Sequence, residues 1–413
     1  MSSLTNPKVA LIQTLDVAPV INPRVLSLDE GPWRSATLTL AAQLAATAVQ
    51  RDQQGGSAQA EKQLFRDSGL LRLSIPRQLG GAGSSWPEIY RIVRYLAAVD
   101  SSLAHLFAFH HLQLATIQLF ANAQQQDYWL RLTLDQNWFW GNATNGRDTH
   151  LQLVPQDEHY QLLGSKSFCS GALGSDALVV SVPRTFGSQE RVFLVIPAQR
   201  DGLLINDDWD GFGQRQTDSG TVHFEGVYVD AADLLEYGLN SPRASLRTCV
   251  SQLILVQIYL GNAAGALSGA LDYINERARS WPGSTAERPT EDALIQLRLG
   301  GLWARLDAAT LLAERAAGRL QQLLDQHSPT PEERGELATW IAEAKLLSAR
   351  VALDITSEVF ETMGARATSS RFGFDRFWRN VRVHTLHDPL DHKQKDIGRW
   401  LLTGEHPVPS NYS

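Results

Sequence analysis

Three long segments rich in Ala and Leu constrain the fold of this chain most strongly. They cover residues 245–280, 290–326 and 331–363, and a Ser-Pro-Thr-Pro break precedes the third. Glu332 and Glu333 begin the third segment, where acidic side chains favour a helix N-terminus. Long amphipathic segments that follow one another through short breaks are typical of an antiparallel helical bundle.

The sequence period changes twice before this bundle. From about Trp138 to Leu235 the helical period fades, and short β-branched or aromatic runs alternate with Gly, Asp and Ser. Further upstream, segments such as 87–99 and 102–122 again have a helical period. We therefore predict an α+β chain of three parts: an N-terminal α-helical domain (1–136), a central β-barrel or sandwich domain (137–238) and a C-terminal four-helix bundle with an extended tail (239–413).

Charge and cysteine content exclude several classes of function. The formal net charge of −7 argues against nucleic-acid binding, because neutralising phosphates requires a basic face. Cys169 and Cys249 offer neither a disulfide framework nor a zinc spacing, which suits a reducing cytoplasm. We see no secretory leader and no apolar run that spans a bilayer, so we expect a cytoplasmic protein without membrane contact. The P-loop and HExxH motifs are absent, and we expect no metal.

The stretch FDRFWRNVRVHTLHDPL (374–390) places two histidines and an aspartate at the end of a helix. Pro389 stops the helix, because its ring cannot lie in a helix interior and it displaces the preceding residue from the α region. His387 and Asp388 can then face a ligand. The alternative is an ordinary helix end, in which His384 and His387 interact with the helix dipole.

Four further clusters carry side chains suited to ligand binding. They are His105 with Phe109, the stretch Trp138–Asn145, the strand end Lys166–Gly171, and Arg277, Arg279 and Trp281 together with Gly364–Arg366. Each also has a plain structural reading as a core histidine, a packed joint, a turn or solvated arginines. Cys169 is expected to be a core residue and not a nucleophile. Taken together, the clusters predict one amphipathic cavity with arginines for a phosphate.

These motifs resemble the acyl-CoA dehydrogenase fold along nearly the whole chain. The resemblance is carried by LSIPRQLGGAG (73–83), GSKSFCSGALGSDALVV (164–180) and the region 359–390. Within that fold, LAHLFAFH, WFWGNAT, SFCSGA, PEERGEL and GFDRFWRNVR…LHDP are similar to the flavin-dependent monooxygenase branch typified by dibenzothiophene monooxygenases. Phe109 stands where those relatives have a tyrosine, and segment 146–150 also differs from them, so a lid and a different substrate are expected there.

The resemblance implies a flavin site and a set of reacting residues. The implied flavin contacts are Phe109, Asn142, Ala143, Thr144, Lys166, Ser167, Phe168, Cys169, Ser170, Arg279, Ala365, Arg366 and His387. The implied catalytic group is His105, Ser170 and His387. The aromatic residues expected to line a substrate pocket are Phe109, Trp138, Trp140 and Trp209. The bulk of Arg366 beside Ala365 favours FMN over FAD, and in this fold the arginines can serve the neighbouring subunit's site.

The implied activity is that of a two-component monooxygenase. A separate NAD(P)H:flavin reductase supplies FMNH2, which reacts with O2 to form a flavin C4a-hydroperoxide, and this species oxygenates a sulfur compound. The sequence leaves open an aromatic thioether, a small sulfinate, a sulfone or an amine as substrate. A homotetramer, built as a dimer of dimers, is expected from the resemblance. The alternatives are an FAD-dependent acyl-CoA dehydrogenase with Asp388 as base and a non-catalytic paralogue that keeps the fold.

Overall fold

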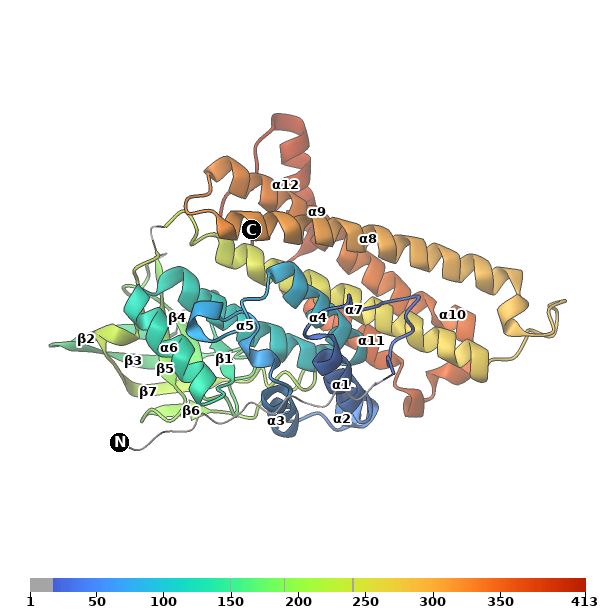
Figure 1. The fold of residues 1–413 in the computed structure, drawn as a ribbon, viewed down its shortest axis with the longest axis horizontal. Coiled ribbons are helices and arrows are strands. Elements are labelled where there is room, and N and C mark those ends of the chain that lie inside the picture. The colour runs from blue at the N-terminus through green and yellow to red at the C-terminus, as the bar shows by residue number, and fades with distance from the viewer. Residues whose placement is uncertain (1–17, 149, 189, 240) are drawn as a thin grey trace, which may run out of the picture.

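The computed structural model describes residues 18–413 except 149, 189 and 240. Along the chain, a group of helices is followed by two small sheets and then by a bundle of long helices (Figure 1). The N-terminal helices are α1 (Arg34–Ala45), α2 (Ala48–Gln54), α3 (Gln59–Ser68), α4 (Trp86–Val99), α5 (Ser101–Phe120) and α6 (Ala123–Asp135). The C-terminal helices are α7 (Leu246–Glu276), α8 (Ala293–Asp325), α9 (Pro331–Glu358), α10 (Phe360–Met363), α11 (Asp375–His384) and α12 (Leu390–Thr403).

Helix α5 is the buried centre of the N-terminal part. Asp100 caps its first turn, because its carboxylate accepts a hydrogen bond from the Leu103 backbone N at 3.1 Å. Almost every side of the helix is buried, including its three histidines, as expected for a helix that is apolar all round. His110 Nδ1 accepts from the Trp140 backbone N at 3.2 Å, and its Nε2 donates to the Leu71 carbonyl at 2.8 Å. This histidine therefore holds the first strand against the helix.

The central part consists of two four-stranded sheets that share one core. The first sheet has the order β1 (Trp140–Ala143), β4 (Ala177–Pro183), β5 (Arg191–Pro197) and β8 (Leu234–Leu235). The second has the order β2 (Gln152–Gln156), β3 (His159–Lys166), β7 (Val222–Val229) and β6 (Leu203–Ile205). Leu162, Val180 and Val222 come from both sheets and lie in the same buried cluster. Of the two predicted forms, the described residues therefore adopt the sandwich and form no closed barrel.

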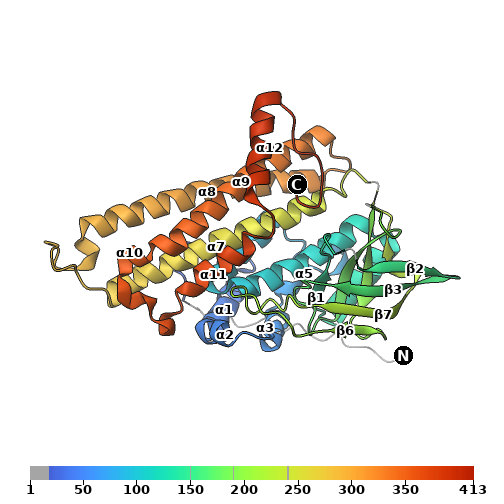
Figure 2. The same ribbon diagram turned by 180° about the vertical axis from the view of Figure 1, so that it is seen from behind.

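Helix α7 is the central helix of the bundle, and α4, α9 and α11 pack against it (Figure 1 and Figure 2). By length and composition α7 passes the test for a membrane span, which corrects the expectation that no apolar run is long enough. In the structure, 94% of its most apolar window is buried, as in a core helix. Gly261 and Gly265 bring α7 close to α4, because a Cβ at either position would collide with the backbone of Arg94 or Ala98.

A buried ion pair ties the N-terminal helices to the sheets. Lys62 on α3 donates to Asp218 Oδ2 at 2.6 Å and also to the Leu173 carbonyl. Burial lowers the pKa of Lys62 and raises the pKa of Asp218, while the attraction between the two charges opposes both shifts. Asp218 lies next to Ser219, which touches the site described below.

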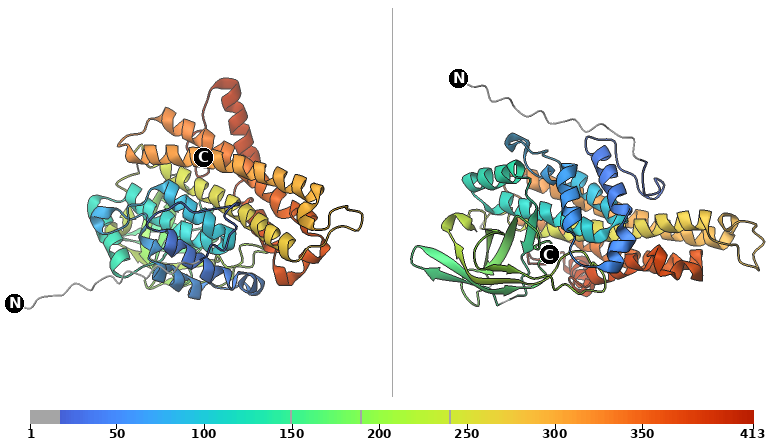
Figure 3. Two further views of the ribbon diagram at one scale, coloured as in Figure 1. Left: turned by 45° about the vertical axis from the view of Figure 1, so that its right-hand side comes forward. Right: turned by 90° about the horizontal axis from the view of Figure 1, so that it is seen from below.

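Seen from below, the C-terminus lies at the junction of the sheets and the bundle (Figure 3).

Candidate active site

Three histidines from separate stretches meet beside α5. His105 stacks on Phe109, one turn along the helix, with ring centroids 4.0 Å apart, and lies 4.8 Å from the ring of His384 at the end of α11. Tyr259 on α7 donates to the His384 carbonyl at 3.0 Å and so fixes the end of α11. His387 follows one turn later and is close enough for its charge to lower the pKa of His105. The structure thus brings together two of the three residues predicted to be catalytic.

The inner histidines are neutral near pH 7. Burial, and after it the charge of His387, lowers the pKa of His105 to about 3. Burial also holds the pKa of His384 well below its ordinary value. Among the described residues, neither ring nitrogen of His105 has a hydrogen-bond partner, nor do His384 Nδ1 and Gln113 Oε1. Buried polar atoms without partners are costly, so this cluster is suited to a ligand that carries donors and acceptors.

His387 is the exposed member of the cluster and is anchored from one side. Its side chain is 43% exposed, and its Nδ1 lies 3.0 Å from Asp388 Oδ1. Asp388 is 4% exposed and forms ion pairs with Lys345 on α9 and, at 3.7 Å, with Lys393 on α12. Burial alone would raise the pKa of Asp388. The hydrogen bond with His387 and the charge of Lys345 outweigh burial and hold the pKa well below its usual range.

The first sheet supplies a polar wall next to α5. The Asn142 backbone N donates to the Ser170 carbonyl at 3.0 Å. Asn142 Oδ1 accepts from Thr144 Oγ1 at 2.6 Å and from Gln113 Nε2 at 3.3 Å, which links the wall to the helix. Ser170 Oγ lies 2.8 Å from Ser219 Oγ. The predicted contacts Asn142, Thr144 and Ser170 therefore lie together, with Ala143 buried between two of them.

The stretch from Lys166 to Cys169 forms the next part of this wall. Lys166 Nζ donates to the Asn145 carbonyl at 2.6 Å, and burial, more than any nearby charge, lowers the pKa of this lysine to about 7. Phe168 has a positive φ of 54°, which is rare for a bulky residue and marks local strain. Its ring is 58% exposed and lies 5.9 Å from Trp209. Phe168 and Trp209 thus form an apolar edge that is open to solvent.

Cys169 is a core residue, as predicted. It is fully buried in the cluster shared by the two sheets, and its Sγ donates to the Lys166 carbonyl at 3.4 Å. Burial raises the pKa of its thiol to about 12, so the nucleophilic thiolate is not populated at neutral pH. The neighbouring Ser167 has a different environment, because its Oγ lies 3.0 Å from Asp148 Oδ2. That contact joins the wall to segment 146–150, the stretch expected to form a lid.

Two of the predicted pocket residues lie in a hydrophobic core. Trp140 is fully buried, packs against Trp129 and Trp138, and donates through Nε1 to Thr133 Oγ1 at 2.9 Å. These contacts belong to the core between α6 and the first sheet. The structure therefore gives Trp138 and Trp140 packing contacts, and the pocket role assigned to them from the sequence stays a prediction.

The predicted phosphate-binding residues lie far from the histidines within one chain. Arg279 follows α7, while Ala365 and Arg366 begin the short 3₁₀ turn Ala365–Thr368 after α10. All three are exposed, and among the described residues neither arginine forms an ion pair. Figure 1 shows α10 and the α7–α8 connection at the end of the bundle opposite the sheets. A single chain does not bring these arginines to His387.

Residues that the sequence reasoning overlooked complete the surroundings of His387. The Tyr412 ring lies 5.9 Å from the His387 ring, and Arg147 lies 5.3 Å from the same tyrosine ring. Lys393 donates to the Tyr412 carbonyl. The tail therefore folds back over the site, a contact that no local sequence pattern indicates. Lys345 did leave a signal, because it is a charged residue on the same face of its helix as the apolar Ile341.

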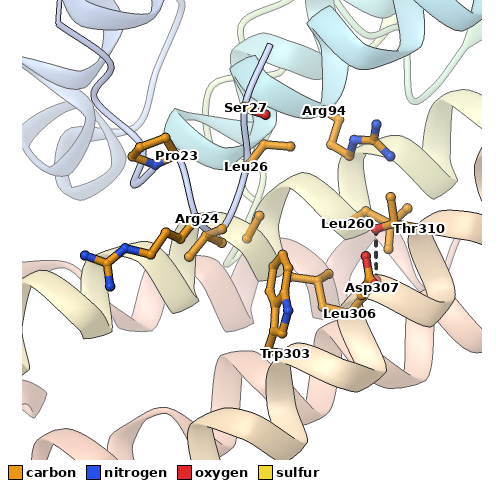
Figure 4. Close-up of a pocket in the computed structure, with 12 residues that line it drawn as sticks. Pro23, Arg24, Leu26, Ser27, Arg94, Leu260, Trp303, Leu306, Asp307 and Thr310 are labelled. Atoms are coloured by element: carbon orange, nitrogen blue, oxygen red, sulfur yellow. Dashed lines mark hydrogen bonds between the residues drawn. The ribbon is translucent and has the colours of Figure 1, made fainter. Parts of the chain in front are cut away.

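A separate cavity lies away from this cluster. It has a volume of about 310 Å³ and is bounded by residues 23–27, α4, α7 and α8 (Figure 4). Its lining includes Arg94, Trp303 and Asp307 but none of the histidines. The polar wall and the unpartnered histidine nitrogens, and not this cavity, therefore define the candidate active site.

Comparison with known protein families agrees with the three-part architecture. Residues 34–136 match the model for the acyl-CoA dehydrogenase N-terminal domain, and residues 253–392 match the model for its C-terminal domain. The chain belongs to the acyl-CoA dehydrogenase family. The fold expected from the sequence motifs is confirmed, and several family members that share about 40% identity with this chain are named as monooxygenases.

Two curated relatives align with almost the whole of this chain. It is 43% identical to the probable FMNH2-dependent monooxygenase SfnC of Pseudomonas putida, over 91% of this chain and 95% of that protein. It is 41% identical to a dibenzothiophene monooxygenase of Rhodococcus erythropolis, over 90% of this chain and 93% of that protein.

Solved structures place the chain in the same group. Methanesulfinate monooxygenase MsuC from Pseudomonas fluorescens superposes with a TM-score of 0.90 at 42% identity, over 93% of this chain and all of that one. FMN-bound TdsC from Paenibacillus sp. A11-2 superposes with a TM-score of 0.87 at 39% identity, covering 92% and 98% of the two chains. Butyryl-CoA dehydrogenase from Megasphaera elsdenii shares the fold at 19% identity, with a TM-score of 0.78.

Proposed function

We propose that this chain is an FMNH2-dependent monooxygenase that adds an oxygen atom from O2 to the sulfur of a small organic compound. The observation that carries the proposal is the cluster of His105, His384 and His387 beside the polar wall. In this cluster, both ring nitrogens of His105 and the Nδ1 of His384 are buried and have no hydrogen-bond partner among the described residues. The identity to SfnC, dibenzothiophene monooxygenase and MsuC supports both the cofactor and the sulfur substrate.

The residues at the site fit a flavin. A flat ring system with nitrogen and oxygen atoms along its edge could hydrogen-bond His105 and the Gln113 amide. The polar wall, which Gln113 contacts through Asn142, offers a further amide and two hydroxyls from Asn142, Thr144 and Ser170. Each unpartnered buried group costs about 1–3 kcal/mol, and a ligand that satisfies it recovers that free energy. FMN, when bound in reduced form, would supply the electrons that activate O2.

The chain's own residues would orient the reactants, exclude water and move one proton. His105 has a pKa of about 3 and therefore acts only as a neutral hydrogen-bonding group. His387 has its Nδ1 engaged by Asp388, so its Nε2 is the atom free to accept or donate a proton. Phe109, which stacks on His105, and the exposed pair of Phe168 and Trp209 offer apolar surface that would exclude water once the reactants are bound.

The acyl-CoA dehydrogenase alternative conflicts with the environment of Asp388. A general base that removes a carbon-bound proton must reach the substrate and have a pKa near the working pH. Asp388 is buried, its carboxylate contacts Lys345 and His387, and its pKa lies well below the usual range for an aspartate. This carboxylate is placed to hold its neighbours and not to abstract a proton.

The position of the arginines supports a site shared between two copies of the chain. Arg279 and Arg366 are exposed, and they belong to the α7–α8 connection and to the turn directly after α10. Figure 1 shows α10 and this connection at the end of the bundle opposite the sheets. Large apolar side chains are also exposed on the bundle helices and the connection that carries Arg279, and they would be covered in an oligomer. They include Trp281, Leu294, Leu297, Leu311, Leu401 and Leu402. We propose a homotetramer in which these arginines hold the FMN phosphate of a neighbouring site.

Mixed oligomers test this arrangement. Arg366→Ala and His387→Ala subunits should each be nearly inactive alone, and co-expressed they should recover about a quarter of wild-type turnover. About half of random pairs are hybrids, and each hybrid has one intact site if the arginine acts across the interface. Arg279→Ala mixed with Arg366→Ala is the matched control and should recover nothing, because every site then lacks one arginine. Absence of recovery in the first mixture would contradict the shared site.

The remaining features of the function follow from the same proposal. A separate NAD(P)H:flavin reductase would deliver FMNH2. The substrate class covers aromatic thioethers and small sulfinates, since the relatives' names span both dibenzothiophene and methanesulfinate. Free cysteines at 169 and 249 suit the reducing cytoplasm that we propose as the location. Turnover of a panel of thioethers, sulfinates and amines with FMN and a reductase tests the substrate class directly.

A further inference from the structure

The hydrogen bond between His387 and Asp388 determines which nitrogen of the imidazole faces outward. A carboxylate can only accept a hydrogen bond, so the Nδ1 that lies 3.0 Å from Asp388 Oδ1 carries the proton. In the neutral ring, Nε2 then carries the lone pair. If Asp388 were free to turn away, both tautomers and several ring orientations would be populated, because the His387 side chain is 43% exposed.

Asp388 is itself held by lysines on two helices of the bundle, and a residue of a third helix orients one of these lysines. Lys345 on α9 contacts Asp388 Oδ1, the same oxygen that accepts from His387. Gln252 on α7 accepts from Lys345 Nζ at 2.7 Å and so orients the ammonium group. Lys393 on α12 lies farther from the carboxylate, at 3.7 Å, and donates to the Tyr412 carbonyl. Lys345 is therefore the cation in direct contact with the carboxylate.

A contribution to stability does not by itself explain why a lysine occupies position 345. The side chain is fully buried, and burial lowers its pKa to about 8 despite the carboxylate beside it. Replacing a buried ion pair by well-packed apolar residues is often neutral or stabilising. A charged group that costs desolvation and touches a site residue is instead a candidate for a role in positioning.

We propose that Lys345 is a positioning residue for His387: by holding the Asp388 carboxylate, it fixes the tautomer and the orientation of the imidazole. The consequence for turnover rests on the function proposed above, whereas the effect on the imidazole does not. Lys345 touches neither reactant. It acts through Asp388, as the orienting carboxylate acts through a histidine in a hydrolase triad.

The first test uses the protein without flavin. Nitrogen-15 NMR of histidine-labelled protein, with the His387 signal assigned from a His387→Gln variant, should show one tautomer protonated at Nδ1. Lys345→Met keeps an unbranched side chain that is one atom shorter and removes the charge, and it should give a mixture of tautomers. Asp388→Asn should do the same. Lys395→Met, at an exposed lysine on α12, is the matched control and should leave the signal unchanged.

The second test uses turnover with FMN, a reductase and the best substrate of the panel. Lys345→Met should lower kcat by roughly tenfold or more, which is part of the 10²–10⁴ that proton transfer typically contributes, with KM and FMN affinity unchanged. The double variant Lys345→Met/Asp388→Asn should be no slower than Asp388→Asn alone, because the lysine acts through the carboxylate. If the two substitutions lowered kcat by factors that multiply in the double variant, the lysine would not act through the carboxylate.

The outcomes separate the two proposals. If the wild-type protein oxygenates no compound of the panel and the Lys345→Met variant no longer shows a single His387 tautomer, the proposed function is wrong and the positioning role is kept. An active wild type with Lys345→Met unchanged in both tautomer and kcat would overturn the positioning role. If Lys345→Met fails to fold, Gln252→Leu replaces it. That variant leaves both charges in place, and it should broaden the His387 signal if the role is correct.

Discussion

Replacing His387 with alanine should abolish sulfur oxygenation and leave the fold intact. His387 is the one histidine of the cluster whose side chain is largely exposed, and its Nε2 is free to exchange a proton with bound reactants. Positioned proton transfer contributes about 10²–10⁴ to a rate, so turnover should fall by that factor. The change removes no buried apolar surface, so the free energy of unfolding should change little. Product formation from a thioether or sulfinate, followed with FMN and a reductase, measures the loss.

His392→Ala is the matched control for this variant. His392 lies on α12, five residues further along, and is exposed. This control should keep the wild-type rate. In His387→Ala, reduced flavin should still be consumed and hydrogen peroxide should accumulate, because the flavin reduces O2 without an oxygen atom being transferred to the sulfur. A wild-type rate of sulfur oxygenation in His387→Ala would remove this residue from the reaction.

Replacing Lys62 with methionine should lower the free energy of unfolding by about 3–5 kcal/mol, because it leaves a buried carboxylate without its cation. Both side chains are about 1% exposed, and they lie 2.6 Å apart between α3 and the segment before β7. The effect should extend to the site, since Asp218 precedes Ser219, which contacts Ser170 at 2.8 Å. Chemical denaturation at neutral pH measures the change in free energy.

Lys395→Met removes a lysine charge from an exposed position and serves as the comparison. It should shift the free energy of unfolding by less than about 0.5 kcal/mol, as surface substitutions usually do. The double variant Lys62→Met/Asp218→Leu should regain part of the lost stability, because no unpaired buried charge remains. A Lys62→Met protein as stable as the wild type would show that the pair does not hold the N-terminal helices to the sheets.

The helices of the bundle were the most predictable part of the fold. The segments expected at 245–280 and 290–326 form α7 (Leu246–Glu276) and α8 (Ala293–Asp325). The acidic start of the third segment was also informative, because Thr330 and Glu333 form a reciprocal cap at the beginning of α9. Long periodic segments with capping residues carry their structure locally, so the sequence alone suffices for them.

The candidate site was only partly predictable. His105, Asn142, Ser170 and His387 belong to short motifs. The structure brings His105 and His387 into the histidine cluster and places Asn142 and Ser170 in the polar wall next to α5. The partners of His387 come from other elements: Lys345 lies 43 residues away from Asp388 in sequence, and Tyr412 lies in the tail. Such contacts depend on how the helices pack, and no local pattern encodes that.

The aromatic residues from Trp138 to Trp140 were difficult to interpret for another reason. The run of Trp138, Phe139 and Trp140 suggested a pocket, because large aromatics suit a flat ligand. In the structure, Trp140 satisfies its N–H within the core and packs against Trp129 of α6. The same residue types line cores and pockets alike. The choice between the two depends on the neighbouring helix, which the local sequence does not reveal.

Oxygen isotope transfer tests the central claim most directly. The protein is supplied with FMN, a flavin reductase, NADH and ¹⁸O2 together with a thioether or a sulfinate, and the product is weighed. The account predicts a sulfur product that carries one ¹⁸O atom for each oxygenation step, and FMN as the flavin that supports it. Bound FAD, with electrons passed from an acyl-CoA to an acceptor and no ¹⁸O in any product, would contradict it.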